Sequence, residues 1–263
     1  MSKTGLLDAL RAEWIKLRTV SGSVWLLAGL IVLTVAVSAA ALAANRCPAG
    51  MSCPIDTPKL SLAGVEFGQA VVAILAVLPV CNEYSTGMIR VTFAAMPRRA
   101  NVLAAKAGII GSLVLVAGAI AVLGSVLAGR LILPGHGFSA ARGFPPLSLA
   151  DGPTLRAAVG SVLYLGLIAL LSIGIAAIVR DSAVTIGAVL GVLYLFPVIA
   201  GFVGNPVWHG RLERYSPMAG LNIQATTGLR ILPITPWAGL GVLAAWASLT
   251  LAGGALSMRL RDV

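Results

Sequence analysis

The stretch "VWLLAGLIVLTVAVSAAALAA", residues Val24 to Ala44, has 21 residues and no charged side chain. An α-helix needs about 20 predominantly apolar residues to cross the hydrocarbon core of a bilayer. This stretch therefore predicts a membrane-spanning helix. Five further apolar runs of similar length follow it, at residues 60–81 (with Glu66 near the start), 107–129, 157–179, 183–203 and 237–258.

The composition of the whole chain points to the same class of protein. Charged residues make up 11% of the sequence and the mean hydropathy is +0.96, whereas about a quarter of the residues of a soluble domain are charged. The wealth of Ala, Gly, Leu and Val favours helices over a barrel, whose strands are about 10 residues long and alternate in polarity. We predict an all-α polytopic membrane protein with six transmembrane helices in a single domain, residues 1–263.

The N-terminal leader, residues 1–22, precedes the first span. The first span could be mistaken for a cleaved signal peptide. The leader is too long for the charged start of a signal peptide, and the apolar run after it exceeds the 7 to 15 residues of a signal-peptide core, so we expect an uncleaved membrane anchor. Within the leader, leucines at helical spacing oppose a charged side, which predicts an interfacial helix lying among lipid headgroups. A frayed tail is the alternative. The residues of interest in this helix are Glu13, Trp14, Lys16 and Arg18.

The positions of the basic residues predict the orientation. With both ends in the cytoplasm, the inner segments hold eleven of the nineteen Lys and Arg residues, although they are shorter than the outer loops. This bias agrees with the positive-inside rule. Because the cations follow the membrane edges, the net charge of +10 gives no reason to expect nucleic-acid binding.

Two outer segments carry specific expectations. The orientation places Cys47 and Cys53 outside, where an oxidising compartment permits a disulfide between them, with two free thiols as the alternative. The long outer loop, residues 204–236, mixes apolar and polar residues, and we expect it to fold back onto the membrane as short or re-entrant helices.

The sequence offers little chemistry for catalysis or cofactor binding. His136 and His209 lie in different loops without the spacing of a metal site, and no phosphate-loop motif is present to bind ATP. Glu66 is the one acid inside a candidate span. It lies near the outer end of that span, which suggests an interfacial position. We therefore expect no enzyme activity and no cofactor on this chain.

The charged interruption "NEYSTGMIRVTFAAMPRRANVLAAK", residues 82–106, separates the second and third runs. Burying its five charged side chains would cost on the order of 15 kcal/mol on insertion scales, so we expect a cytosolic segment. Residues 88–96 predict a short helix with Ile89 and Phe93 on one face and Arg90 on the other, ended by Pro97. Such a helix suits a groove on another protein.

These residues resemble the first cytoplasmic loop of the permease subunits of ABC transporters of the type-2 export class. The resembling features are an acid (Glu83), a turn (Thr86 and Gly87), a short helix, a proline with basic residues (Pro97 to Arg99) and Lys106 at the head of the third span. The leader "EWIKLRTV" and the segment "RYSPMAG", residues 214–220, are similar to actinobacterial members. The turn departs from the family pattern in reading Ser-Thr-Gly-Met, which leaves its capping contacts open.

The resemblance implies a permease in the plasma membrane that pairs with a second permease chain, identical or related, and with separate ATPase subunits that hold ATP and magnesium. It implies that the short helix is a coupling helix docking on the ATPase, with the leader beside it. The residues so implied are Glu83, Tyr84, Gly87, Ile89, Arg90, Phe93, Pro97, Arg98 and Arg99. An accessory or assembly subunit without an ATPase is the main alternative, followed by a secondary carrier and a membrane enzyme.

Overall fold

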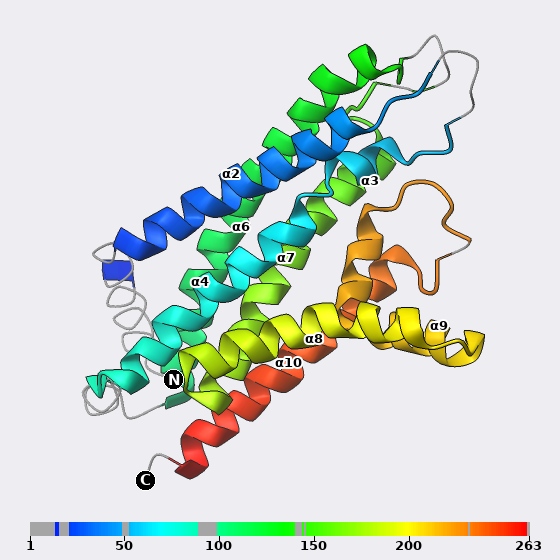
Figure 1. The fold of residues 1–263 in the computed structure, drawn as a ribbon. Helices are drawn as coiled ribbons and strands as arrows, with labels where there is room; N and C mark the ends of the chain where they lie inside the picture. Colours follow the sequence, from blue (N-terminus) through cyan, green and yellow to red (C-terminus); the bar gives the residue numbers. More distant parts are fainter. Residues whose placement is uncertain are drawn as a thin grey trace.

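The computed structural model describes residues 14–15, 21–48, 53–88, 99–139, 144, 146–230 and 232–261. Within these residues the regular elements are helices, and no strand occurs. The six long helices, coloured along the chain in Figure 1, are α2 (Ser21–Ala44), α4 (Val65–Ser85), α6 (Arg99–Ile132), α7 (Gly152–Val179), α8 (Ser182–Phe202) and α10 (Pro236–Arg261). The shorter ones are α3 (Thr57–Ser61), η1 (Leu133–His136), α9 (Pro206–Tyr215) and η3 (Pro217–Gln224).

All six long helices are long and apolar enough to cross a membrane. The predicted all-α polytopic fold is therefore confirmed, and the chain is a multi-pass membrane protein. The predicted ends at Ala44 and Val179 coincide with the ends of α2 and α7. Of the predicted leader helix, residues 14 and 15 are helical, whereas Ser21 and Gly22 already belong to α2.

Helix α7 forms the centre of the bundle and has the most buried span of the six. It packs against α4, α6 and α10, while α2 packs against α6 and α4. Helix α8 lies at the edge, against α4 and α7, and most of its surface is uncovered. The start of α2 and the end of α10 lie toward the same end of the bundle, as an even number of spans requires (Figure 1).

The second span begins five residues later than the sequence predicts. Residues up to Ser61 form the separate helix α3, and a turn then leads into α4 at Val65. The turn lies tight against α2, since the Gly64 amide donates to Ser38 Oγ (3.0 Å) and a Cβ on Gly64 would lie 1.9 Å from the Thr34 carbonyl oxygen. The close approach of two backbones thus sets the start of this span.

The loop between α8 and α10 is largely helical and packs into the bundle. Gly220 of η3 lies against the Tyr164 ring, and Ile223 lies against Gly160. Tyr164 is 12 residues into α7, which places it about 18 Å along that helix. Helix η3 therefore lies beside the middle of a candidate span. This packing supports the re-entrant arrangement expected for residues 204–236, which stays a prediction.

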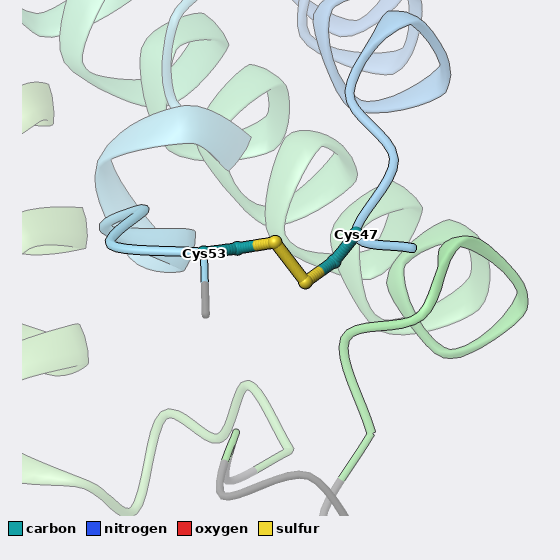
Figure 2. Close-up of a disulfide and its surroundings, with 2 residues drawn as sticks. All are labelled: Cys47 and Cys53. Atoms are coloured by element: carbon teal, nitrogen blue, oxygen red, sulfur yellow. A yellow bond between two sulfur atoms is a disulfide. The ribbon is translucent and has the colours of Figure 1, made fainter. Parts of the chain in front are cut away.

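A disulfide closes the connection that follows α2. It joins Cys47 to Cys53 with an S–S distance of 2.02 Å, so the two residues are not free thiols in this structure (Figure 2). The Cys47 amide donates to the His136 carbonyl oxygen (2.9 Å). Around the disulfide, a small separate core brings together Leu42, Leu133, Phe138 and Leu147.

Asp56 connects this region to the loop between α8 and α10. Its carboxylate accepts hydrogen bonds from the Thr226 amide (2.6 Å), the Thr226 hydroxyl (2.7 Å) and the Thr227 amide (2.8 Å), and it also caps α3 at Lys59. Partial burial acts to raise the pKa of Asp56, but these hydrogen bonds outweigh it, so the pKa lies below its ordinary value.

The contact between α2 and α4 can be tested at Gly64. A Gly64→Ala substitution adds a Cβ that collides with backbone rather than with a flexible side chain, so the two helices must move apart. We expect the thermal unfolding midpoint in detergent to fall by several degrees. The matched control is Gly187→Ala, where a Cβ meets nothing within 4 Å, and it is expected to leave the midpoint unchanged. Equal midpoints for both variants would contradict the tight contact.

The stability that Asp56 contributes through its hydrogen bonds to Thr226 and Thr227 should depend on pH. Because its folded-state pKa is lowered, the stability it adds is present above the unfolded pKa, near 3.8, and is lost as the pH falls through the folded pKa. We expect Asp56→Asn to lower the unfolding midpoint at pH 7, and we expect the difference from wild type to shrink below about pH 4. A difference that stays constant over this range would refute the charge-dependent role.

Candidate functional site: the base of the segment between α4 and α6

The segment between the second and third spans is shorter than the sequence predicts. We expected a cytosolic loop over residues 82–106, but α4 continues to Ser85 and α6 begins at Arg99. Glu83 and Tyr84 therefore belong to the end of α4, and Lys106 lies two turns into α6. The residues between the two helices are described only as far as Met88.

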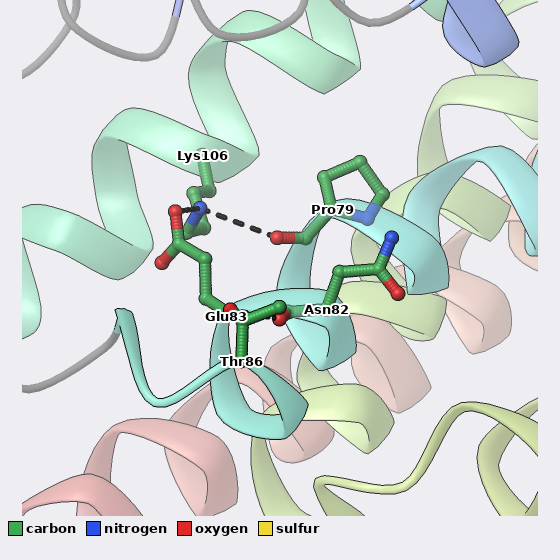
Figure 3. Close-up of polar contacts among 5 residues, drawn as sticks. All are labelled: Pro79, Asn82, Glu83, Thr86 and Lys106. Carbon is green, nitrogen blue, oxygen red and sulfur yellow. Dashed lines mark hydrogen bonds and ion pairs between the residues drawn. The ribbon is translucent and has the colours of Figure 1, made fainter.

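Glu83 and Lys106 form a buried ion pair that joins α4 to α6. The Lys106 Nζ lies 2.8 Å from Glu83 Oε1 and donates a longer hydrogen bond, 3.5 Å, to the Pro79 carbonyl oxygen (Figure 3). Both side chains are over 90% buried. These two charges lie in the protein interior near the ends of α4 and α6, where each compensates the other. The cytosolic location of the segment stays a prediction.

The end of α4 is capped by the turn that follows it. The Thr86 hydroxyl donates to the Asn82 carbonyl oxygen (2.7 Å), and the Thr86 amide donates to the same oxygen (3.1 Å). Gly87 then adopts a positive φ of 69°, a conformation that glycine takes without strain. The Ser-Thr-Gly turn thus ends the helix with a hydroxyl cap and a left-handed glycine.

Arg180 ties this end of α4 to α10. It ends α7 in the left-handed conformation, with a φ of 68°. Its guanidinium lies over the Tyr84 ring, 4.9 Å from the centroid, and donates to the Ser257 carbonyl oxygen (3.2 Å). Asp181 is the one residue between Arg180 and the start of α8. Its side chain caps the first turn of α8 by accepting a hydrogen bond from the Val184 amide (2.8 Å).

We call Glu83, Tyr84, Lys106, Arg180 and Ser257 the inner cluster. It joins the ends of α4, α6, α7 and α10 at the base of the 86–98 segment. Within the described residues, no group of three or more His, Cys, Asp or Glu side chains is placed to hold a metal ion. The cluster thus ties the ends of four spans together where the 86–98 segment begins.

Several residues singled out from the sequence lie outside the described residues. Gly87 and Trp14 are described, and Trp14 is exposed. For Arg99, the structure describes the helical backbone and not the side chain. The residues that fall outside are Glu13, Lys16, Arg18, Ile89, Arg90, Phe93, Pro97 and Arg98.

Sequence reasoning missed Arg180 and Ser257 as members of the inner cluster. A signal for Arg180 was present, since Arg180 and Asp181 are the only charged residues between two long apolar runs. Ser257 gave none, because a serine near the end of a span usually bonds its own helix.

Comparison with known proteins adds no assignment. No protein-family model matches the chain, and no curated protein matches it in sequence.

The Glu83–Lys106 pair predicts a coupling between two substitutions. Glu83→Ala or Lys106→Met alone leaves one buried charge without its main partner, and each should cost about 3 to 5 kcal/mol of unfolding free energy. The double variant removes both charges and should cost clearly less than the sum of the two. The measurement is equilibrium unfolding in mixed detergent micelles.

The control for this cycle is Glu213→Ala, which removes an exposed carboxylate paired with His209 at 3.4 Å. It should change the unfolding free energy by no more than about 0.5 kcal/mol. Strictly additive costs of Glu83→Ala and Lys106→Met would show that the ion pair does not hold the two helices together.

Proposed function

We propose that this chain is the transmembrane permease subunit of an ATP-driven exporter of the ABC type-2 class, in the plasma membrane. In this proposal it pairs with a second permease chain and with separate ATPase subunits, which bind ATP and magnesium. The observation that carries the proposal is the inner cluster, which ties the base of a basic segment between two spans to four helices of the bundle.

The inner cluster supports the proposal through its mechanics. A partner that pushes on the 86–98 segment acts on α4 through its capped end and on α6 through its first turns. The Glu83–Lys106 pair keeps these two helix ends together (2.8 Å). Arg180 extends the connection to α10 through Ser257 and to α8 through the adjoining turn. One docking site thus acts on most of the spans, as coupling of ATP hydrolysis to a rearrangement of helices requires.

The charge pattern of the segment also favours a protein partner. Arg90, Arg98 and Arg99 lie in or beside it in the sequence, and the leader, residues 1–22, carries further cations. Basic side chains next to a membrane suit both anionic lipid headgroups and acidic grooves on a soluble subunit. The resemblance of this segment to type-2 permeases selects an ATPase as that subunit.

Arg90 offers the cleanest test, since it belongs to the segment and not to the buried ion pair. We expect Arg90→Ala to leave membrane insertion and thermal stability unchanged and to lower transport-coupled ATP hydrolysis at least several-fold. The assay uses the permease with its copurified ATPase in reconstituted membranes. Arg211→Ala is the matched control, because Arg211 stacks on Trp208 (5.2 Å) in α9, far along the chain from the segment.

Two results would count against the proposal. The first is wild-type hydrolysis by the Arg90 variant. The second is a tagged chain that, in mild detergent, repeatedly copurifies with proteins other than an ATPase, which would favour the accessory or assembly role.

A further inference from the structure

Glu66 occupies an unexpected depth in the bundle. It lies between Gly64 and Gly68, and both glycines pack against Thr34 of α2. Thr34 is ten residues from the end of α2 at Ala44, which corresponds to about 15 Å along that helix. The sequence suggested an interfacial position at the outer end of a span. The structure places Glu66 beside the middle of α2 instead, because α4 starts well below the outer end of its neighbour.

Among the described residues, the Glu66 carboxylate takes part in no ion pair or hydrogen bond, and its side chain is exposed on the surface of α4. The buried Glu83 at the other end of α4, by contrast, is paired with Lys106. A carboxylate at membrane depth is costly and persists mainly where a function requires it.

Polar and aromatic groups surround this position. The Tyr194 hydroxyl of α8 donates to the Glu66 carbonyl oxygen (2.7 Å), which brings the Tyr194 ring next to the start of α4. Gln69 lies one turn after Glu66 and is fully buried. Its Oε1 accepts from the Tyr164 hydroxyl, and its Nε2 has no hydrogen-bond partner among the described residues. Because the remaining capacity of Gln69 is that of a buried N–H donor, Gln69 belongs to the packing behind Glu66 and does not face a bound cation.

The surface next to Glu66 is open and apolar. Phe67 is 53% exposed, and a Cβ on Gly191, one turn before Tyr194, would meet nothing within 4 Å. Leu195 and Val198 of α8 are exposed as well. A bulky apolar molecule can therefore approach the carboxylate along the surface formed by α4 and α8 without displacing any part of the chain.

We propose that Glu66, with Tyr194, forms a binding site for a hydrophobic monovalent cation such as a quaternary ammonium or phosphonium ion. The carboxylate supplies the opposite charge, the Tyr194 ring supplies a face that attracts cations, and the apolar surface accepts the hydrophobic groups. This inference deepens the proposed export function by naming the charge class of the cargo. An anionic lipid headgroup is disfavoured at this place, because it would be repelled by Glu66.

The test measures binding and does not require an ATPase. The full-length chain is placed in nanodiscs of neutral phosphatidylcholine, and equilibrium dialysis measures binding of tetraphenylphosphonium and of tetraphenylborate, which share size and shape and differ in charge. We expect saturable binding of the phosphonium beyond that of protein-free nanodiscs, and at least tenfold weaker saturable binding of the borate beyond the same background. Glu66→Gln should weaken phosphonium binding at least tenfold, whereas Glu66→Asp should retain most of it.

The control variant is Glu213→Gln, which neutralises an exposed carboxylate on α9 and should bind as wild type does. Size-exclusion chromatography verifies that each variant is folded. Unchanged phosphonium binding by Glu66→Gln, or equal binding of the two ions by wild type, overturns the inference. So does a wild-type chain that binds no phosphonium while Glu66→Gln alters its dimerisation, because Glu66 would then contact a second copy.

The outcome is separable from that of the proposed function. Phosphonium binding that depends on Glu66, in a chain that copurifies with no ATPase, supports the site and contradicts the exporter. ATPase copurification without such binding contradicts the site alone.

Discussion

The inner end of the bundle depends on the mutual compensation of two buried charges. Glu83 and Lys106 lie 2.8 Å apart with little access to solvent, and either alone would be expensive to keep there. Their pairing lets both side chains stay buried where α4 ends and α6 begins. The segment between these helices is therefore attached at both ends to helices that the ion pair holds together. Arg180 contacts Tyr84 at the end of α4 and also bonds to Ser257 of α10.

The outer half of the protein is organised by small residues. Gly64 and Gly68 allow α4 to start against the middle of α2, and Gly220 allows η3 to pack on the Tyr164 ring. These contacts place the beginning of α4 and the whole of η3 below the outer ends of α2 and α7. The depth of Glu66 follows from this arrangement, since a residue at the start of a span is shallow only if all spans start at the same level.

The number, type and approximate limits of the spans were predictable, because continuous apolar runs of about 20 residues dominate the sequence. The positions that escaped prediction depend on contacts between distant segments. The break before Val65 reflects the approach of Gly64 to Thr34, 30 residues away in the sequence. Asp56 and Pro58 are local signals for the start of α3, but they do not predict that approach. The continuation of α4 and α6 into the 82–106 segment has a similar origin, since the burial of Glu83 depends on Lys106, 23 residues away. Of the site, Glu83, Tyr84, Gly87 and Lys106 came from the sequence, while Ser257 could come only from the structure.

The disulfide and the hydrogen bonds of Asp56 limit how the loops at their end of the bundle can move. The disulfide holds the connection after α2 to α3, and Asp56 at the head of α3 holds Thr226 and Thr227 of the last outer loop. The first and last outer connections of the chain are thereby joined across the bundle. A rearrangement of the bundle that leaves these bonds intact therefore moves the connection between α2 and α4 together with the loop between α8 and α10.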